Sequence, residues 1–153
     1  METLFGKKKN FYKANLHCHT TYSDGKRTPE EIKEAYLARG YSAVAFTDHE
    51  HLIDHSYLTD GEFVAITGAE LAIKEFPEQS TGVNTKMKVT HLNIYAKSPE
   101  NTRTPCYSSL QDHYVYDWTR HLVRHEGEFE RIQSHEGIND IVSRAKKAGF
   151  LVA

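Results

Sequence analysis

The 153-residue sequence predicts an α/β fold in which buried strands alternate with helices. The run at 43–46 is continuously apolar, which is typical of a strand buried on both faces of a parallel sheet. Apolar residues recur with helical spacing at 32–36 and again at 138–148. The last residues, 150–153, have the pattern of a further strand, so we expect an α/β unit that is cut before its architecture closes.

Local signals mark the first strand and the first helix. A mixed aromatic and apolar stretch predicts a strand over 11–18, and Ser-Asp-Gly at 23–25 predicts a turn. Thr28 supplies a capping hydroxyl before a proline, and Glu31 completes a capping box, so a helix is expected to begin there. Arg39 and the glycine after it predict the end of this helix.

The later segments repeat this organisation. Strands are predicted at 62–67 and 88–95, and polar residues of metal-ligand type lie at or near both. Residues 98–136 are aromatic-rich and irregular, with a helix expected at about 117–123, and we interpret them as an insertion. Order returns with the second amphipathic helix. The whole chain, 1–153, is therefore predicted to form a single domain.

Composition excludes several classes of protein. A hydrophobic content of 39% with 26% charged residues fits a globular domain and not a disordered or fibrous chain. The net charge of −2 provides no strong signal for nucleic-acid binding. Two cysteines cannot build a disulfide framework. No apolar stretch of signal-peptide or membrane-span length follows the basic run at 7–9, so a cytoplasmic protein with no membrane partner is predicted.

Ten histidines are more than a chain of this length usually carries, and imidazole is the commonest protein ligand of metal ions. In an extended strand, His17 and His19 point to the same face, so one ion could take both. Cys18 would point the other way, into packing. The alternative is that both are ordinary core or surface histidines, and the neighbouring motifs decide between a ligand pair and this alternative.

Four more residues are candidate ligands. His49 and Glu70 fall at the predicted ends of buried strands, where functional side chains gather, although a backbone-bonded histidine and a solvated glutamate are the alternatives. Asp24 precedes a glycine, as turn-forming aspartates often do. His91 lies inside an alternating strand, where a packed, hydrogen-bonded histidine is the alternative.

These motifs, in this order, resemble the PHP family, the polymerase and histidinol phosphatase domains. The matching motifs are His-Cys-His-Thr-Thr-Tyr-Ser-Asp-Gly at 17–25, Thr-Asp-His at 47–49, Gly-Ala-Glu-Leu at 68–71 and Thr-His-Leu-Asn at 90–93. The resemblance covers about residues 12–95 and resumes at 138–153. It implies a distorted (β/α)7 TIM-like barrel of the PHP type, incomplete in this chain, with metal ions at the carboxyl ends of its strands.

The resemblance also implies which residues hold two or three divalent ions, zinc, manganese or iron. By it, His17 and His19 bind the first ion, Glu70 bridges the first and second, His91 binds the second, and Asp24 with His49 binds the third. Glu70 and Asp24 are also the catalytic candidates. Ions that share a carboxylate would lower the pKa of a bridging water, and the resulting hydroxide would be the nucleophile.

The implied enzyme is a metal-dependent phosphoric ester hydrolase. Its substrates would be phosphomonoesters or terminal phosphodiesters, and its partner a small phosphorylated substrate or nucleotide. The remaining ligands of the family, a His-Pro histidine and an Asp-x-His pair, would lie beyond Ala153. The alternative hypothesis is therefore a truncated, catalytically silent metal-binding or regulatory scaffold.

The other histidines and the aromatic residues have simpler interpretations. His51 and His55 are interpreted as solvated residues near the surface, with contact to a substrate phosphate as the alternative. Four histidines are interpreted as structural or surface residues of the insertion, namely His113, His121, His125 and His135. The aromatic side chains of the insertion are expected to form a small core of their own, with nucleobase stacking as the alternative.

Overall fold

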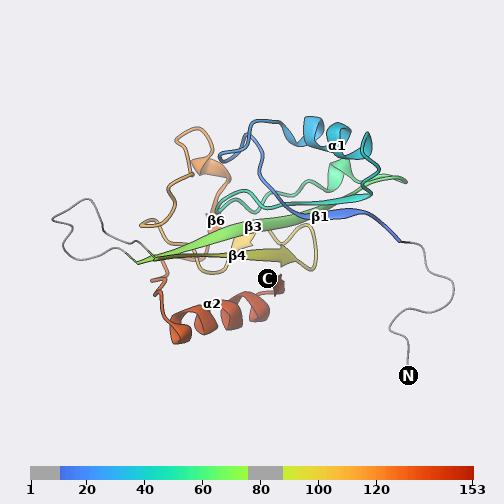
Figure 1. The fold of residues 1–153 in the computed structure, drawn as a ribbon. Helices are drawn as coiled ribbons and strands as arrows, with labels where there is room; N and C mark the ends of the chain where they lie inside the picture. Colours follow the sequence, from blue (N-terminus) through green and yellow to red (C-terminus); the bar gives the residue numbers. More distant parts are fainter. Residues whose placement is uncertain (1–10, 76–87) are drawn as a thin grey trace, which may run out of the picture.

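The computed structural model describes residues 11–75 and 88–153, so the basic run at 7–9 lies outside the described residues. Five strands form one sheet in the order β1-β2-β3-β4-β7 (Figure 1). They are β1 (Ala14–Cys18), β2 (Ala43–Phe46), β3 (Val64–Glu75), β4 (Lys88–Ala96) and β7 (Phe150–Val152). Helix α1 (Pro29–Leu37) lies on one side of the sheet and helix α2 (His135–Lys147) on the other, which confirms the α/β class.

Strands β1, β2 and β3 run parallel to one another, with β2 in the centre of the group. Val44, Ala45 and Phe46 of β2 are at most 1% exposed, as the apolar run predicts for a strand covered on both faces. The pairing of β1 with β2 is irregular between Asn15 and Cys18. The carboxyl ends of β1 and β2 lie beside the middle of β3, which continues past them to Glu75.

Helix α1 begins at the predicted capping box. The hydroxyl of Thr28 accepts a hydrogen bond from the N–H of Glu31 at 3.3 Å, and the carboxylate of Glu31 accepts one from the N–H of Thr28 at 2.9 Å. The helix ends at Leu37, slightly before the predicted Arg39, and Gly40 follows in the left-handed conformation (φ 74°). Its buried face packs onto β1 and β2.

Strand β3 is longer than predicted, and β4 beside it runs in the opposite direction. The predicted end at Thr67 is wrong because the strand continues through Gly68, where a Cβ would meet the carbonyl oxygen of Ile94 at 2.8 Å. The extension, Gly68–Glu75, pairs antiparallel with β4, which pairs antiparallel with β7. Antiparallel neighbours need no helical crossover. Among the described residues the sheet is therefore open and mixed, and the predicted (β/α)7 barrel is not seen.

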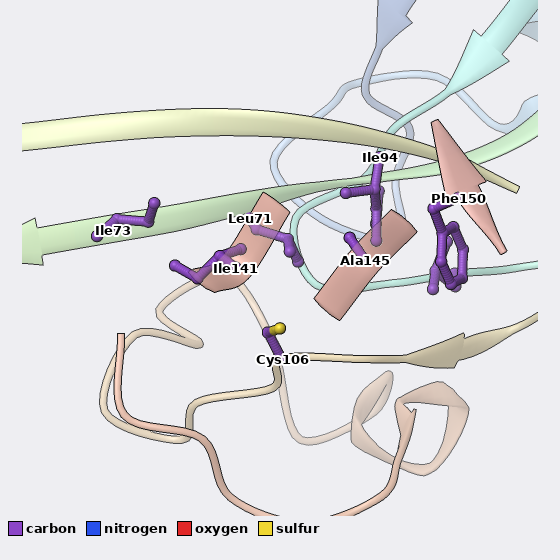
Figure 2. Packing of buried hydrophobic residues seen from close by; sticks show 9 residues of the cluster. Leu71, Ile73, Ile94, Cys106, Ile141, Ala145 and Phe150 are labelled. Atoms are coloured by element: carbon purple, nitrogen blue, oxygen red, sulfur yellow. The ribbon is translucent and has the colours of Figure 1, made fainter. Parts of the chain in front are cut away.

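Helix α2 covers the other face of the sheet. It begins one turn earlier than predicted, where the hydroxyl of Ser134 accepts a hydrogen bond from the N–H of Gly137 at 3.0 Å. Figure 2 shows Ile141 of this helix beside Leu71, within a cluster that also holds Ile94. Burying each large aliphatic side chain contributes roughly 1.5–3 kcal/mol, so this cluster holds α2 against β3 and β4. No helix in the described ranges is both long and apolar enough to cross a membrane.

The aromatic segment, residues 98–136, is irregular, as predicted for an insertion. Its short elements are β5 (Arg103–Thr104), which runs parallel to β6 (Arg124–His125), and the single-turn helix η2 (Arg120–Leu122) in place of the longer helix expected at 117–123. Cys106 and Phe129 join the cluster beneath α2. Tyr107 is buried, whereas Trp118 is 56% exposed. Only part of the aromatic side chains therefore forms a core.

Candidate metal centre

All six residues predicted to bind metal line one cavity of about 820 Å³. They are His17, His19, Asp24, His49, Glu70 and His91. The cavity lies beyond the carboxyl ends of β1 and β2, alongside the extended part of β3. Residues that are distant in the sequence thus meet where parallel strands end, the usual place for a site in an α/β sheet.

Glu70 lies at the centre of this cluster. Its side chain is 5% exposed, and nitrogen atoms of four histidines approach its two oxygens. The nitrogens facing Oε1 are Nδ1 of His91 at 2.7 Å and Nε2 of His17 at 3.8 Å, and those facing Oε2 are Nδ1 of His49 and Nε2 of His19, both at 3.1 Å. Glu70 therefore belongs to a buried strand surface, and the alternative of a solvated loop carboxylate is wrong.

The end of β1 presents His17 and His19 together. Their rings meet edge to face with centroids 4.7 Å apart, while Cys18 packs into the cluster under α1, as the alternation of side chains predicts. The hydroxyl of Thr47 lies 2.9 Å from Nδ1 of His17 and accepts a hydrogen bond from the N–H of Cys18 at 3.1 Å. This contact leaves Nε2 of His17 facing Glu70.

Asp24 reaches the cluster from the loop that follows β1. Its Oδ1 lies 2.6 Å from Nδ1 of His19, and its Oδ2 lies 3.8 Å from Nε2 of His49. The residue occupies a turn, as the Asp-Gly pair predicts, and its carboxylate faces the cavity as well. The two interpretations of Asp24 are therefore compatible.

Buried Asp48 holds this loop in place. Its carboxylate accepts hydrogen bonds from the N–H of Thr20 at 2.7 Å, from the hydroxyl of Thr20 at 2.8 Å and from the hydroxyl of Ser23 at 2.6 Å. Three hydrogen bonds to one carboxyl group fix its position relative to the loop. Asp48 thus fixes the backbone that presents Asp24, a role that the sequence did not predict.

Replacing Gly25 by alanine is expected to weaken metal binding by displacing this loop. A Cβ at Gly25 would lie 2.4 Å from the carbonyl oxygen of His19 and 2.6 Å from the nitrogen of Thr20, distances that close packing does not allow. The neighbouring carboxylate of Asp24 would move with the backbone. We expect about 10–100-fold lower affinity for Mn²⁺ by calorimetric titration, the usual effect of losing a partner behind a ligand.

The matched control for this variant is Gly61→Ala, because a Cβ at Gly61 meets no atom within 4 Å. Its affinity should equal that of the wild type. Equal affinities of the two glycine variants would contradict the proposed importance of the loop.

His49 and His91 approach Glu70 from two different neighbours of β3. His49 forms an isolated parallel bridge with Glu70, next to the end of β2. His91 stands on β4 opposite Ala72, and its side chain is 42% exposed to the cavity, so the alternative of a packed core histidine is wrong. The antiparallel direction of β4 places His91 beside Glu70 although it lies in mid-strand.

The aromatic segment supplies a wall of the cavity, which the sequence did not predict. Residues 109–114 line it, and the ring of Tyr114 stacks on that of His49 with centroids 4.4 Å apart and an interplanar angle of 19°. His113 is exposed and contacts Tyr114. The three other histidines of the segment take the predicted structural or surface positions, with His121 and His135 exposed and His125 stacked on Tyr107.

The prediction that His51 and His55 are solvated is wrong. They are 1% and 2% exposed, and burial lowers the pKa of both. Nδ1 of His51 donates a hydrogen bond to the carbonyl of His49 at 2.6 Å, so His51 supports the backbone of the site. His55 precedes helix η1 (Ser56–Leu58) and packs against the ring of Phe46. Both residues follow closely after a buried strand in the sequence, and this position could have indicated that they are buried.

The cluster has the spacing of metal ligands. Its ligand atoms form two groups, each within 4.8 Å, namely His17, His19 and Glu70, and His19, Asp24 and His49. Two atoms bound to one ion at about 2.1 Å lie roughly 3.0–3.4 Å apart, which matches the 3.1 Å between Nε2 of His19 and Oε2 of Glu70. That nitrogen is buried and makes no hydrogen bond among the described residues, so a bound ion would satisfy it. Mixed imidazole and carboxylate donors fit zinc, manganese or iron.

Electrostatics also favour a cation here. Burial opposes ionisation of Glu70, yet the imidazoles around it lower its pKa to about 2. Burial likewise opposes protonation of His19, but the carboxylates of Glu70 and Asp24 outweigh it and raise its pKa to about 9. At His49 burial dominates and lowers the pKa to about 4. The cluster thus combines an ionised carboxylate with a proton on His19 that an ion would displace.

Comparisons with known proteins find a matching family model, similar sequences and a partly similar solved structure. The family model of the PHP domain matches residues 15–148. Error-prone DNA polymerases are similar, with 33% identity over 113 residues for that of Cutibacterium acnes (70% of this chain) and 32% over 103 residues for that of Mycobacterium tuberculosis (59% of this chain). The chain spans only 10% and 8% of these relatives. A crystal structure of a protein assigned as a metal-dependent phosphoesterase, from Bifidobacterium adolescentis, aligns with a TM-score of 0.43 and 22% identity over 61% of this chain and 31% of that one.

Proposed function

This chain belongs to the PHP domain family, and we propose on that premise that it is a metal-dependent phosphoesterase. The proposed reaction is hydrolysis of a phosphomonoester or of a terminal phosphodiester in a small phosphorylated molecule or nucleotide. The proposed cofactors are two or three divalent ions, chosen among zinc, manganese and iron.

The placement of Glu70 between two pairs of histidines carries this proposal. Each of its oxygens faces two imidazole nitrogens, at 2.7 and 3.8 Å on one side and at 3.1 Å twice on the other. A carboxylate that bridges two ions needs nitrogen ligands close to both of its oxygens, and both oxygens of Glu70 have them. Paired ions about 3.5–4 Å apart are the usual centre for in-line displacement at phosphorus.

The six residues would divide between neighbouring ions. The two histidines at the end of β1 would hold one ion with Glu70. Asp24 and His49 would hold another, and His19 stands within reach of both groups. His91 faces Oε1 of Glu70, the oxygen that His17 also faces, and would take part in binding there. When bound, the ions would lower the pKa of a water towards neutrality and neutralise phosphate oxygens.

The cavity also offers one positive side chain to an anionic substrate. Lys74 is the one lysine or arginine among the described residues that line it. Residues 70, 72 and 74 share a face of β3, because side chains alternate along a strand, so Lys74 lies on the same wall as Glu70. An ammonium group here would bind a substrate phosphate as a point charge.

Metal analysis combined with a hydrolysis assay tests the proposal. The purified protein is expected to hold about two to three ions per chain by elemental analysis and to hydrolyse an aryl phosphate when Mn²⁺ is added. A chelator should abolish the turnover, and added metal should restore it. A protein that binds no metal and shows no chelator-sensitive turnover would contradict the proposal and leave a silent scaffold.

Metal affinity is expected to rise with pH. An ion must replace the proton on His19, whose pKa is about 9, whereas His49, with a pKa of about 4, is already neutral at pH 7. Below pH 9 the protonated form of His19 competes with the ion, so the apparent affinity should fall about tenfold for each pH unit. Calorimetric titration with Mn²⁺ between pH 7 and 8.5, in buffers of different ionisation enthalpy, would measure the protons released. An affinity that does not change over this range would contradict it.

A further inference from the structure

We infer that the buried ion pair between Glu50 and Arg131 is a positioning device, which holds the ring of His49 in the cavity and ties the aromatic segment to the metal centre. The inference rests on the proposed function in one respect, which is that the ligand of His49 is a metal ion. It assigns a role to the aromatic segment, which supplies Arg131 and also a wall of the cavity.

The side chain of Arg131 is fully buried, and its guanidinium donates hydrogen bonds to several different groups. Both of its terminal nitrogens donate to the carboxylate of Glu50, each at 2.6 Å. Its Nε donates to the carbonyl of Cys106 at 2.7 Å, and Nη1 donates to the carbonyl of Ala72 at 2.9 Å. Ala72 is two residues from Glu70 along β3. One side chain therefore connects the aromatic segment, the strand that carries Glu70 and the residue after His49.

Glu50 has an unusual backbone that these contacts keep in place. It is the one non-glycine residue with a positive φ, 62°, in the described ranges. Its N–H donates to the carbonyl of Glu70 at 3.1 Å, and its own carbonyl accepts from the hydroxyl of Thr104 at 3.3 Å. A left-handed conformation in such a residue costs free energy and persists where the surroundings enforce it. The chain is thus turned sharply at the residue that follows His49.

The turn at Glu50 determines where the ring of His49 lies. The peptide group between His49 and Glu50 is held on both sides: its carbonyl accepts a hydrogen bond from Nδ1 of His51, and its N–H donates one to the carbonyl of Glu70. The backbone on the carboxyl side of His49 is therefore fixed. The ring of His49 also stacks on that of Tyr114, which belongs to the same aromatic segment as Arg131. The segment therefore contacts His49 directly through Tyr114 and the next residue, Glu50, through Arg131.

Stability alone does not account for this pair. A buried ion pair is costly to desolvate, and a pair of well-packed apolar side chains of similar size is often as stable or more stable. An apolar pair would not define the direction of the chain, whereas a two-pronged guanidinium–carboxylate contact does. The buried ion pair lies beside His49, and the direction of the chain at this point determines where the side chain of His49 lies.

Two conservative variants, Arg131→Lys and Glu50→Gln, test the inference in the full chain. The ring resonances of His49 in two-bond ¹H–¹⁵N spectra of the metal-free protein report its environment and need no ion. Calorimetric titration with Mn²⁺ reports affinity. We expect both variants to shift or broaden the His49 resonances and to weaken Mn²⁺ binding by about 10–100-fold. Ile141→Ala, in the cluster beneath α2, is the control for lost stability and should leave both readouts unchanged.

A double variant keeps the inference testable if a single variant does not fold. Glu50→Gly with Arg131→Met removes both buried charges and allows a left-handed backbone at no steric cost, so it should fold, yet it lacks the anchor. We expect its His49 resonances to change as well. Unchanged His49 resonances in the folded variants, with wild-type Mn²⁺ affinity, would overturn the inference. A wild-type protein that binds no Mn²⁺ would overturn the proposed function instead, and the resonances alone would then decide the inference.

Discussion

Glu70→Gln is expected to abolish metal binding and hydrolysis. The amide cannot carry the negative charge that offsets two cations, and it offers one oxygen where the carboxylate offers two, each facing two imidazoles. Loss of a partner behind a metal ligand typically costs about 10–100-fold in affinity or activity, so losing the shared ligand should cost at least about 100-fold in kcat/KM. Elemental analysis and aryl phosphate hydrolysis would measure both effects.

The control for this variant is Glu75→Gln at the far end of the same strand. Glu75 is about half exposed and pairs with Lys88 at 2.9 Å, outside the cavity. The same chemical change should leave metal content and turnover as in the wild type. A Glu70→Gln protein that retains its metal and its activity would exclude a bridging role for this carboxylate.

Arg131→Met is expected to produce a large loss of stability. The change leaves the carboxylate of Glu50 buried without its partner and removes the donors to two backbone carbonyls. Breaking a buried pair in this way typically costs about 3–5 kcal/mol. The free energy of unfolding from urea titrations should fall by that amount, and Tm by roughly 6–20 °C.

Two further variants bracket that result. Arg144→Met breaks an exposed pair with Asp140 and a cation–π contact with Phe129, which together should cost no more than about 2 kcal/mol. Adding Glu50→Gln to Arg131→Met removes the unpaired charge and should recover part of the lost stability. If Arg131→Met and Arg144→Met cost the same, the buried pair would not be the structural anchor described above.

Local patterns in the sequence predicted most of the elements, and the structure places the six candidate ligands around one cavity. The capping box at Thr28 and the apolar run of β2 depend on neighbouring residues alone, so they can be predicted without knowledge of tertiary contacts. His17 and His19 share a face because of strand alternation, which is equally local.

Features that depend on distant contacts were not predictable. Local residues predict that β3 ends at Thr67, whereas the missing side chain of Gly68 lets β4 approach and the strand continue. Nothing nearby in the sequence indicates the contact with the carbonyl of Ile94. The antiparallel direction of β4 follows from that extension. The roles of Tyr114 and Arg131 depend on partners about 65 and 81 residues away, so the aromatic segment reads as an insertion although it lines the site.

The alternation of β1 has a consequence for the kind of ion that the proposed metal centre would select. Cys18 stands between two candidate nitrogen ligands but points beneath α1, where burial raises the pKa of its thiol to about 11. The sulfur is thereby kept out of the cavity that the two neighbouring histidines line, so thiophilic ions such as Cu(I) would lack the donor they prefer. A slip of β1 by one residue would exchange the imidazoles for the thiol. The register of one short strand thus sets the hard or soft character of the whole centre.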